Sequence, residues 1–145
     1  YTLMGAALTG ATAGLVYWFP KMTGRMLNER ASYVSFWLVQ IGFQVLYLGM
    51  FIAGAEGQPR RVADFAADYG TSNKISTIAA YIIGTGFIIL LWAVVHSWRH
   101  GEKAPMNPWG AKTLEWTVPY PVPLVNFDTP PVVTSDPYGY GKAQK

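Results

Sequence analysis

Residues 75–98 read ISTIAAYIIGTGFIILLWAVVHSW, a run of 24 residues without Asp, Glu, Lys or Arg. A helix needs about 20 consecutive apolar residues to cross a hydrocarbon core of about 30 Å. Two more runs without these charged residues cover residues 1–20 and 31–55. The pattern predicts three transmembrane helices, at about residues 2–19, 32–54 and 75–98, and therefore an all-α membrane protein.

The composition agrees with this class. Only 13% of the 145 residues are charged and 51% are hydrophobic, whereas an ordinary soluble domain has roughly 25% charged residues. The chain has no cysteine, which excludes a disulfide framework, a thiolate metal site and a cysteine nucleophile within it. The net charge of +3 comes from basic residues near the ends of the apolar runs, and this placement argues against a nucleic acid partner.

The basic residues also predict an orientation. The first loop and the segment after the third helix carry Lys21, Arg25, Arg30, Arg99, Lys103 and Lys112. They outnumber the basic residues of the middle loop, so the positive-inside rule places both segments in the cytoplasm or an organelle matrix. We expect residues 1–104 to form the helices with short loops. Residues 105–145 are rich in proline, which predicts an extended cytoplasmic tail.

Small and polar residues predict that the helices belong to a larger bundle. Gly10 and Gly14 form a GxxxG pattern, which lets another helix approach closely. Polar residues within the predicted spans would face lipid if the three helices stood alone. These polar residues are Ser35, Gln40, Gln44 and Thr85.

Two pairs of residues are weaker candidates for chemistry. His96 and His100 are four apart and could share one helix face at the spacing of metal ligands. The favoured interpretation is that they are polar residues that meet water at a helix end, where they flank Arg99. Asp64 and Asp68 could form a carboxylate pair, or both could be solvated in a polar loop.

The strongest candidate is the Arg60–Arg61 pair, which follows Gly57-Gln-Pro59 directly after the second span. The predicted orientation puts it on the outer side, where positive charge is not needed for topology. Two guanidinium groups can bind carboxylates or phosphates in a bidentate manner. Two interpretations follow from the residues alone: binding of lipid headgroups, or binding of a buried anionic cofactor.

Several motifs together resemble a known family. They are YWFPK at 17–21, TGRMLNE at 23–29, PRR at 59–61 followed by Asp64, NPWGAKTLEW at 107–116, and a Pro-rich run that ends at Asn126-Phe127. In this order, they resemble the C-terminal part of subunit I of the haem-copper terminal oxidases, the cytochrome c oxidase family. The resemblance covers about residues 1–127. It implies that the three helices are the last three of a twelve-helix bundle.

The resemblance also implies an activity. Such a subunit reduces dioxygen to water with electrons from cytochrome c and pumps protons, and quinol oxidases share the same C-terminal motifs. In the family, an arginine pair that matches Arg60 and Arg61 binds the propionates of the low-spin and high-spin haems. The haem and copper ligands of the family pattern would precede Tyr1, which resembles the last residue of a His-Phe-His-Tyr motif. We therefore expect no catalytic residue and no metal ligand in this chain, and a C-terminal fragment or the smaller half of a split subunit I.

The implied partners are the remaining helices of subunit I, subunit II and other oxidase subunits, cytochrome c or quinol, and lipid, in a bacterial inner membrane or an equivalent respiratory membrane. An alternative from another class is a small accessory subunit of a respiratory complex without a redox role. The arginine pair and the NPWGAKTLEW motif argue against that alternative. We further expect Trp109 and Trp116 to pack against helix ends, and residues from about Ser135 onward to be mobile unless a neighbouring subunit holds them.

Overall fold

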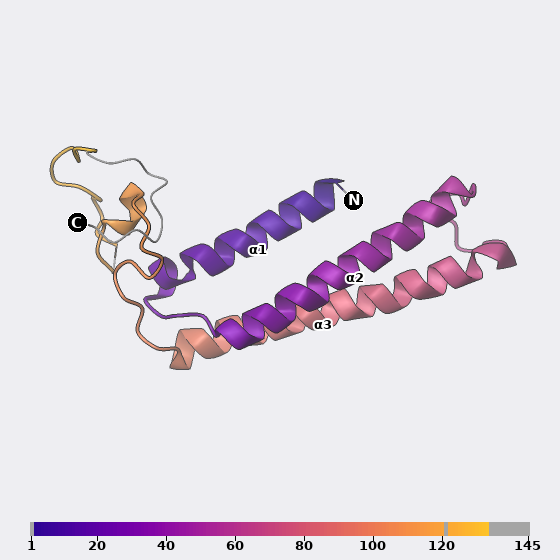
Figure 1. Ribbon diagram of the computed structural model, residues 1–145, viewed down its shortest axis with the longest axis horizontal. Coiled ribbons are helices and arrows are strands. Elements are labelled where there is room, and N and C mark those ends of the chain that lie inside the picture. Colours follow the sequence, from indigo (N-terminus) through magenta and orange to yellow (C-terminus); the bar gives the residue numbers. More distant parts are fainter. Residues whose placement is uncertain (1, 121, 134–145) are drawn as a thin grey trace.

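The computed structural model describes residues 2–120 and 122–133, and all regular structure in these ranges is helical. The elements are α1 (Thr2–Thr23), α2 (Glu29–Ala55), the short 3₁₀ turn η1 (Ala67–Tyr69), α3 (Gly70–His100) and the 3₁₀ turn η2 (Leu114–Trp116). Helices α2 and α3 lie side by side and run antiparallel, while α1 lies apart from them over much of its length (Figure 1). The all-α prediction is confirmed. The residues expected to be mobile, from Ser135 onward, lie outside the described part.

Each helix continues past the apolar run that predicted it. Helix α2 begins at Glu29 rather than near residue 32, because the Asn28 side chain caps it by accepting the Ala31 N–H at 3.0 Å. A charged residue ends the apolar run, but the helix itself continues through it. Two segments, Glu29–Ala55 and Ala67–His100, are long and apolar enough to cross a membrane. Helix α1, with 22 residues, is not one of them, so its crossing stays a prediction.

The contact between α2 and α3 is a seam of small residues, each set repeating every seven positions. The seam consists of Ser35, Gly42 and Gly49 from α2 and Ala79, Gly86 and Ala93 from α3. Small residues allow the two backbones to come close, as is common between membrane helices.

Gly86 shows how tight this seam is. A Cβ atom on Gly86 would lie 2.8 Å from Cγ2 of Val39 and 3.2 Å from the carbonyl oxygen of Ser35. The Ser35 hydroxyl is buried and donates to the Gly86 carbonyl at 2.8 Å. Thr85 donates instead to the Tyr81 carbonyl of its own helix at 2.9 Å. Both hydroxyl groups are therefore satisfied without a further helix.

The glycine of α1 that contacts another helix is not one of the two in the GxxxG pattern. Gly5, not Gly10 or Gly14, contacts α2, because a Cβ atom there would lie 2.5 Å from the ring of Phe43. A Cβ atom on Gly10 would have no neighbour within 4 Å beyond its own helix backbone, and one on Gly14 would meet only Trp18 of its own helix. The prediction that Gly10 and Gly14 face another helix of the bundle stays a prediction.

Candidate functional site

Residues 56–66, here called the arginine loop, connect α2 to η1 at the end of the helix pair far from the tail (Figure 1). The chain leaves α2 through a glycine turn. Gly57 has φ +98° and donates to the Gly54 carbonyl at 3.1 Å, while the Gln58 N–H reaches the Ala53 carbonyl at 3.0 Å. These two bonds form the turn that commonly ends a helix with glycine.

Two side-chain contacts then fix the loop to the start of α3. The Tyr69 hydroxyl donates to the Glu56 carbonyl at 3.1 Å, and the Gln58 amide donates to Oδ1 of Asn73 at 3.4 Å. The arginine pair follows immediately after this anchored stretch. The backbone of the arginine pair therefore follows directly after residues that are held in place by contacts with η1 and α3.

Arg60 and Arg61 are both exposed, and neither forms a hydrogen bond or an ion pair within residues 2–120 and 122–133. Arg61 has φ +58°, a left-handed conformation that is uncommon for residues other than glycine. Such a conformation costs on the order of 1–3 kcal/mol and is often found at functional positions. Two adjacent guanidinium groups without partners in the described residues can donate hydrogen bonds to two carboxylates or phosphates.

The acidic residues near this loop are exposed to solvent. Asp64 lies in the loop and Asp68 in η1, and both are exposed. Within the described residues, no group of three or more His, Cys, Asp or Glu side chains could hold a metal ion. The positions of the two aspartates fit the solvated interpretation.

The opposite end of the structure is held by the tail. We call the contacts of residues 101–120 with the end of α1 and the loop after it the tail clasp. Its centre is Tyr17, whose carbonyl accepts the indole N–H of Trp109 at 2.9 Å and whose hydroxyl accepts that of Trp116 at 2.7 Å. The Tyr17 ring stacks on Trp109 and meets Trp116 edge-on, with centroids 6.1 and 5.3 Å apart. The expected packing of both tryptophans against a helix end is confirmed.

Lys21 adds a second contact between α1 and the tail. Its ammonium donates to the Val118 carbonyl and lies 5.7 Å from the ring centroid of Trp116. Burial lowers the pKa of Lys21, and the nearby charge of Glu115 partly offsets this effect. Lys21 lies beyond the predicted span at residues 2–19, at the boundary between helix and tail.

The backbone completes the tail clasp. The Met26 N–H donates to the Glu102 carbonyl at 2.8 Å and the Ala104 N–H to the Gly24 carbonyl at 2.9 Å. The Arg25 guanidinium donates to the Gly101 carbonyl at 2.6 Å. One further bond joins the start of α2 to α3, from the Asn28 N–H to the Ser97 hydroxyl at 2.9 Å. The ends of α1, α2 and α3 are thus tied together through residues far apart in sequence.

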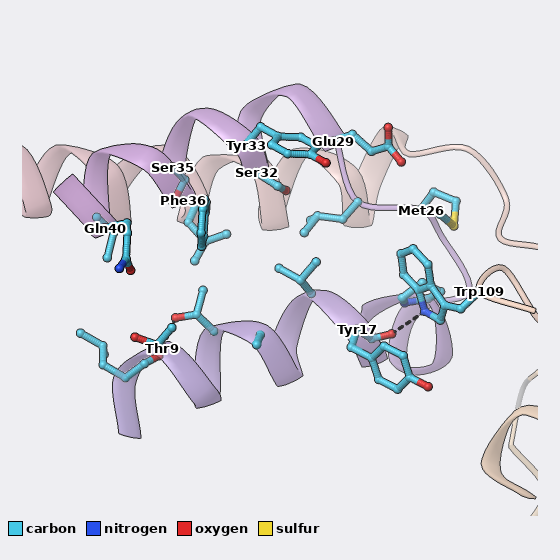
Figure 2. A pocket seen from close by; sticks show the side chains of 18 residues that line it. Thr9, Tyr17, Met26, Glu29, Ser32, Tyr33, Ser35, Phe36, Gln40 and Trp109 are labelled. Carbon is cyan, nitrogen blue, oxygen red and sulfur yellow. Dashed lines mark hydrogen bonds between the residues drawn. The ribbon is translucent and has the colours of Figure 1, made fainter. Parts of the chain in front are cut away.

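A groove of about 590 Å³ lies between α1 and α2. Figure 2 shows Thr9 and Tyr17 on the α1 side, facing Phe36 and Gln40 on the α2 side, with Trp109 at the clasp end. Most of the lining is apolar, so the groove suits hydrocarbon rather than a charged substrate. The groove was not predicted from the sequence, because the distance between two helices cannot be derived from the sequence of either helix.

His96 and His100 lie together on one face of α3. Their ring centroids are 5.3 Å apart, and His96 also stacks on Trp92 at 4.9 Å with 23° between the ring planes. Both histidines are exposed. The same-face placement that their spacing predicted is confirmed.

The roles of Tyr17, Lys21 and Asn28 were not predicted from the sequence. The first two lie in the YWFPK motif, which indicated only a family resemblance, and an interfacial tyrosine has a simpler explanation in the aromatic belt. Asn28 precedes an apolar run, so a cap could have been predicted from its position. The partners of Tyr17 and Lys21 are 92 to 99 residues away, and a single sequence carries no signal for such pairs.

Comparison with known proteins assigns the chain to a family. The model of the family described as "Cytochrome C and Quinol oxidase polypeptide I" matches residues 1–88, which is more than half of the chain. The chain belongs to this family. It is 43% identical over 141 residues to cytochrome c oxidase subunit 1 of Thermostichus vulcanus, covering 97% of this chain and 26% of that protein.

Two further relatives have the same name. Cytochrome c oxidase subunit 1 of Corynebacterium diphtheriae is 41% identical over 140 residues, covering 94% of this chain and 25% of that protein. The protein of that name from Bacillus sp. strain PS3 is 41% identical over 136 residues, with 92% and 22% covered. The chain thus spans about a quarter of the length of these relatives. Membership of this family makes it part of an all-α membrane protein, as the sequence predicted.

Proposed function

We propose that this chain is the C-terminal portion, or a split half, of the catalytic subunit of a proton-pumping terminal oxidase. The complete oxidase reduces dioxygen to water with electrons from cytochrome c. The observation that carries the proposal is the match of nearly the whole chain to about a quarter of proteins named cytochrome c oxidase subunit 1. Their shared name also favours cytochrome c over quinol as the electron donor.

Within this proposal, Arg60 and Arg61 bind the haem propionates. Three features support the role: both guanidinium groups are exposed, neither has a partner in the described residues, and the preceding Gly57–Gln58 turn is anchored to α3. A propionate is a carboxylate, and the planar fork of an arginine matches its two oxygens. The residues present therefore fit the group.

The arginine pair would act on the propionates by electrostatics and by position. Adjacent guanidinium charge favours the ionised form of a carboxylate, so the pair keeps the propionates deprotonated. Bidentate bonds also fix the orientation of each carboxylate relative to the loop backbone. When bound, haem and copper supply the redox chemistry of dioxygen reduction, and we assign their ligands to the rest of subunit I.

The proposal includes a membrane arrangement. The three helices cross a bacterial inner membrane or an equivalent respiratory membrane, with the arginine loop outside and residues 105–145 as the cytoplasmic tail. Large apolar side chains are exposed along both α2 and α3, for example Phe51 and Ile88. The remaining nine helices of subunit I, other oxidase subunits and lipid would cover such faces, since single scattered exposures are normal but continuous ones are not.

Substitution of the arginines in the complete oxidase tests this function. In Arg60→Leu and Arg61→Leu, an ionised propionate would lose its partner, which costs about 3–5 kcal/mol when the charge is buried. We expect shifted haem potentials and turnover at least 10-fold lower, or loss of haem measured by optical spectroscopy. Lysine at either position keeps the charge without the fork, so it should perturb the potentials while assembly continues.

Lys74→Leu is the matched control, because Lys74 is an exposed cation at the same end of the helix pair. It should leave haem spectra and turnover as in the parent. If both arginine-to-leucine variants kept parental spectra, potentials and turnover, the pair would be an anchor for lipid headgroups and the propionate role would be withdrawn.

A further inference from the structure

The two histidines of the chain have no role in the function proposed above. His96 and His100 are the only imidazole groups in the sequence, which also lacks cysteine. Both lie in the last turns of α3, which remains helical through His100. Neither side chain forms a hydrogen bond within the described residues. Each ring therefore keeps a nitrogen lone pair available.

Their arrangement is that of a chelating pair. Residues at i and i+4 are neighbours on a helix surface, and here the ring centroids are 5.3 Å apart. Trp92 stacks on His96 and restricts the orientation of its ring. Both histidines are exposed within the described residues, so a small rotation of the His100 ring can turn its nitrogen toward His96 while the stacking on Trp92 is kept.

We propose that His96 and His100 bind a divalent transition-metal ion of the zinc class. Imidazole nitrogen suits Zn²⁺, Cu²⁺ and Ni²⁺, whereas Mg²⁺ and Ca²⁺ need several oxygen ligands. Two histidines four residues apart on one helix face are a known zinc-binding arrangement. With two protein ligands, water completes the coordination, so the ion exchanges and the site is weaker than a four-ligand structural site.

The charges around the pair partly balance. The carbonyl groups at the C-terminal end of a helix favour a cation, and α3 ends at His100. Arg99 opposes a second cation, but a neighbouring position on a helix points about 100° away, so its guanidinium does not share the histidine face. Glu102, exposed two residues beyond the helix, adds a negative charge nearby.

The site would lie beside the tail clasp. Ser97, between the two histidines, accepts the N–H of Asn28 at 2.9 Å and its carbonyl accepts the N–H of Gly101 at 2.8 Å. The Gly101 carbonyl accepts the Arg25 guanidinium. An ion that joins His96 to His100 would therefore hold together the helical turn from which these contacts extend.

Zinc binding to the purified membrane complex that contains this chain tests the proposal. After removal of loosely bound metal with a chelator, Zn²⁺ binding is measured by equilibrium dialysis and calorimetry. We expect the parent to have one Zn²⁺ site that weakens by about 100-fold in His96→Gln and in His100→Gln, beside any sites elsewhere in the complex, because joining two ligands typically strengthens binding by that order. Zn²⁺ binding by histidines elsewhere in the complex is the same in parent and variant, so it does not contribute to the difference between them.

A variant with unchanged composition makes the test specific to geometry. Trp98→His combined with His100→Trp keeps both imidazoles but places them two apart, on opposite sides of the helix. It should bind Zn²⁺ as weakly as the single variants, while Arg99→Gln should bind at least as tightly as the parent. Parental affinity in the exchange variant or in both single variants would overturn the proposal. If the exchange variant fails to assemble, shown by its haem spectrum, the single variants decide.

Discussion

At the tail end of the structure, the indole groups of Trp109 and Trp116 donate to oxygens of Tyr17, and the helix ends are joined by backbone bonds. At the other end, the guanidinium groups of Arg60 and Arg61 have no partner in the described residues. The first end is held together by contacts within this chain. The second presents exposed donors, and in the function proposed above the haem propionates are their partners.

The backbone follows the same division. In the tail clasp, donors and acceptors far apart in sequence pair with each other, as is usual for buried polar groups, and the buried Thr113 hydroxyl is an exception without a hydrogen-bond partner. In the arginine loop, the only non-glycine residue with positive φ among the described residues is Arg61. Strain is thus found where a ligand could compensate for it, and satisfied contacts are found where the fold is closed.

The largest expected effect is at the centre of the tail clasp. Trp116 is 2% exposed, so Trp116→Ala should destabilise the tail by about 3–5 kcal/mol, the usual cost of truncating a buried aromatic residue. Limited proteolysis of the complete oxidase should then release residues 105–127 much faster. Leu114→Ala, in the same 3₁₀ turn but 40% exposed, should leave the cleavage rate nearly unchanged. Equal rates in the two variants would show that the clasp does not hold the tail.

An intermediate effect is expected in the seam that joins the two ends. In Gly86→Ala the new methyl group would contact Val39 and the Ser35 backbone, and such overpacking typically costs about 1–3 kcal/mol. The midpoint of thermal denaturation of the purified oxidase should fall. Gly84→Ala is the control, since a Cβ atom there would have no neighbour of this chain within 4 Å beyond its own helix backbone. A similar loss in both variants would mean that the α2–α3 contact is not what limits stability.

The smallest effect concerns backbone strain in the arginine loop. Asparagine tolerates left-handed φ better than most residues, so Arg61→Asn should stabilise the loop by up to about 1 kcal/mol. Arg60→Asn should give no such gain, because Arg60 does not have positive φ. Hydrogen exchange of the amides at residues 57–66 measures the difference. Equal protection in both variants would remove the argument that the loop stores strain at Arg61.

The helices were predictable because a helix that crosses a bilayer needs a long run without charged residues. Runs of this length are easily identified in the sequence. Their ends were less predictable, since capping by Asn28 and the polar turns beyond the apolar runs extend α2 and α3. The GxxxG pattern drew attention to Gly10 and Gly14. The contact with α3 instead uses small residues of α2 spaced by seven, a pattern that is visible in the sequence but does not say which helix it faces.

The candidate site was predictable in part. The position of the arginine pair after Pro59, and its chemistry, follow from the residues, whereas the left-handed conformation of Arg61 depends on the path of the loop. The contact of Trp109 and Trp116 with a helix end followed from the need of a Pro-rich tail for a partner. Tyr17 could not be named as that partner, because closing a loop of more than about 90 residues leaves no local signal.

The tail clasp also has a consequence for biosynthesis. Lys21 and Tyr17 find their partners at Val118, Trp109 and Trp116, 92 to 99 residues later in the chain. While the ribosome is still adding α2 and α3, the end of α1 has none of these contacts. The end of α1 can therefore be fastened to the other helix ends only after residues 101–120 have been translated.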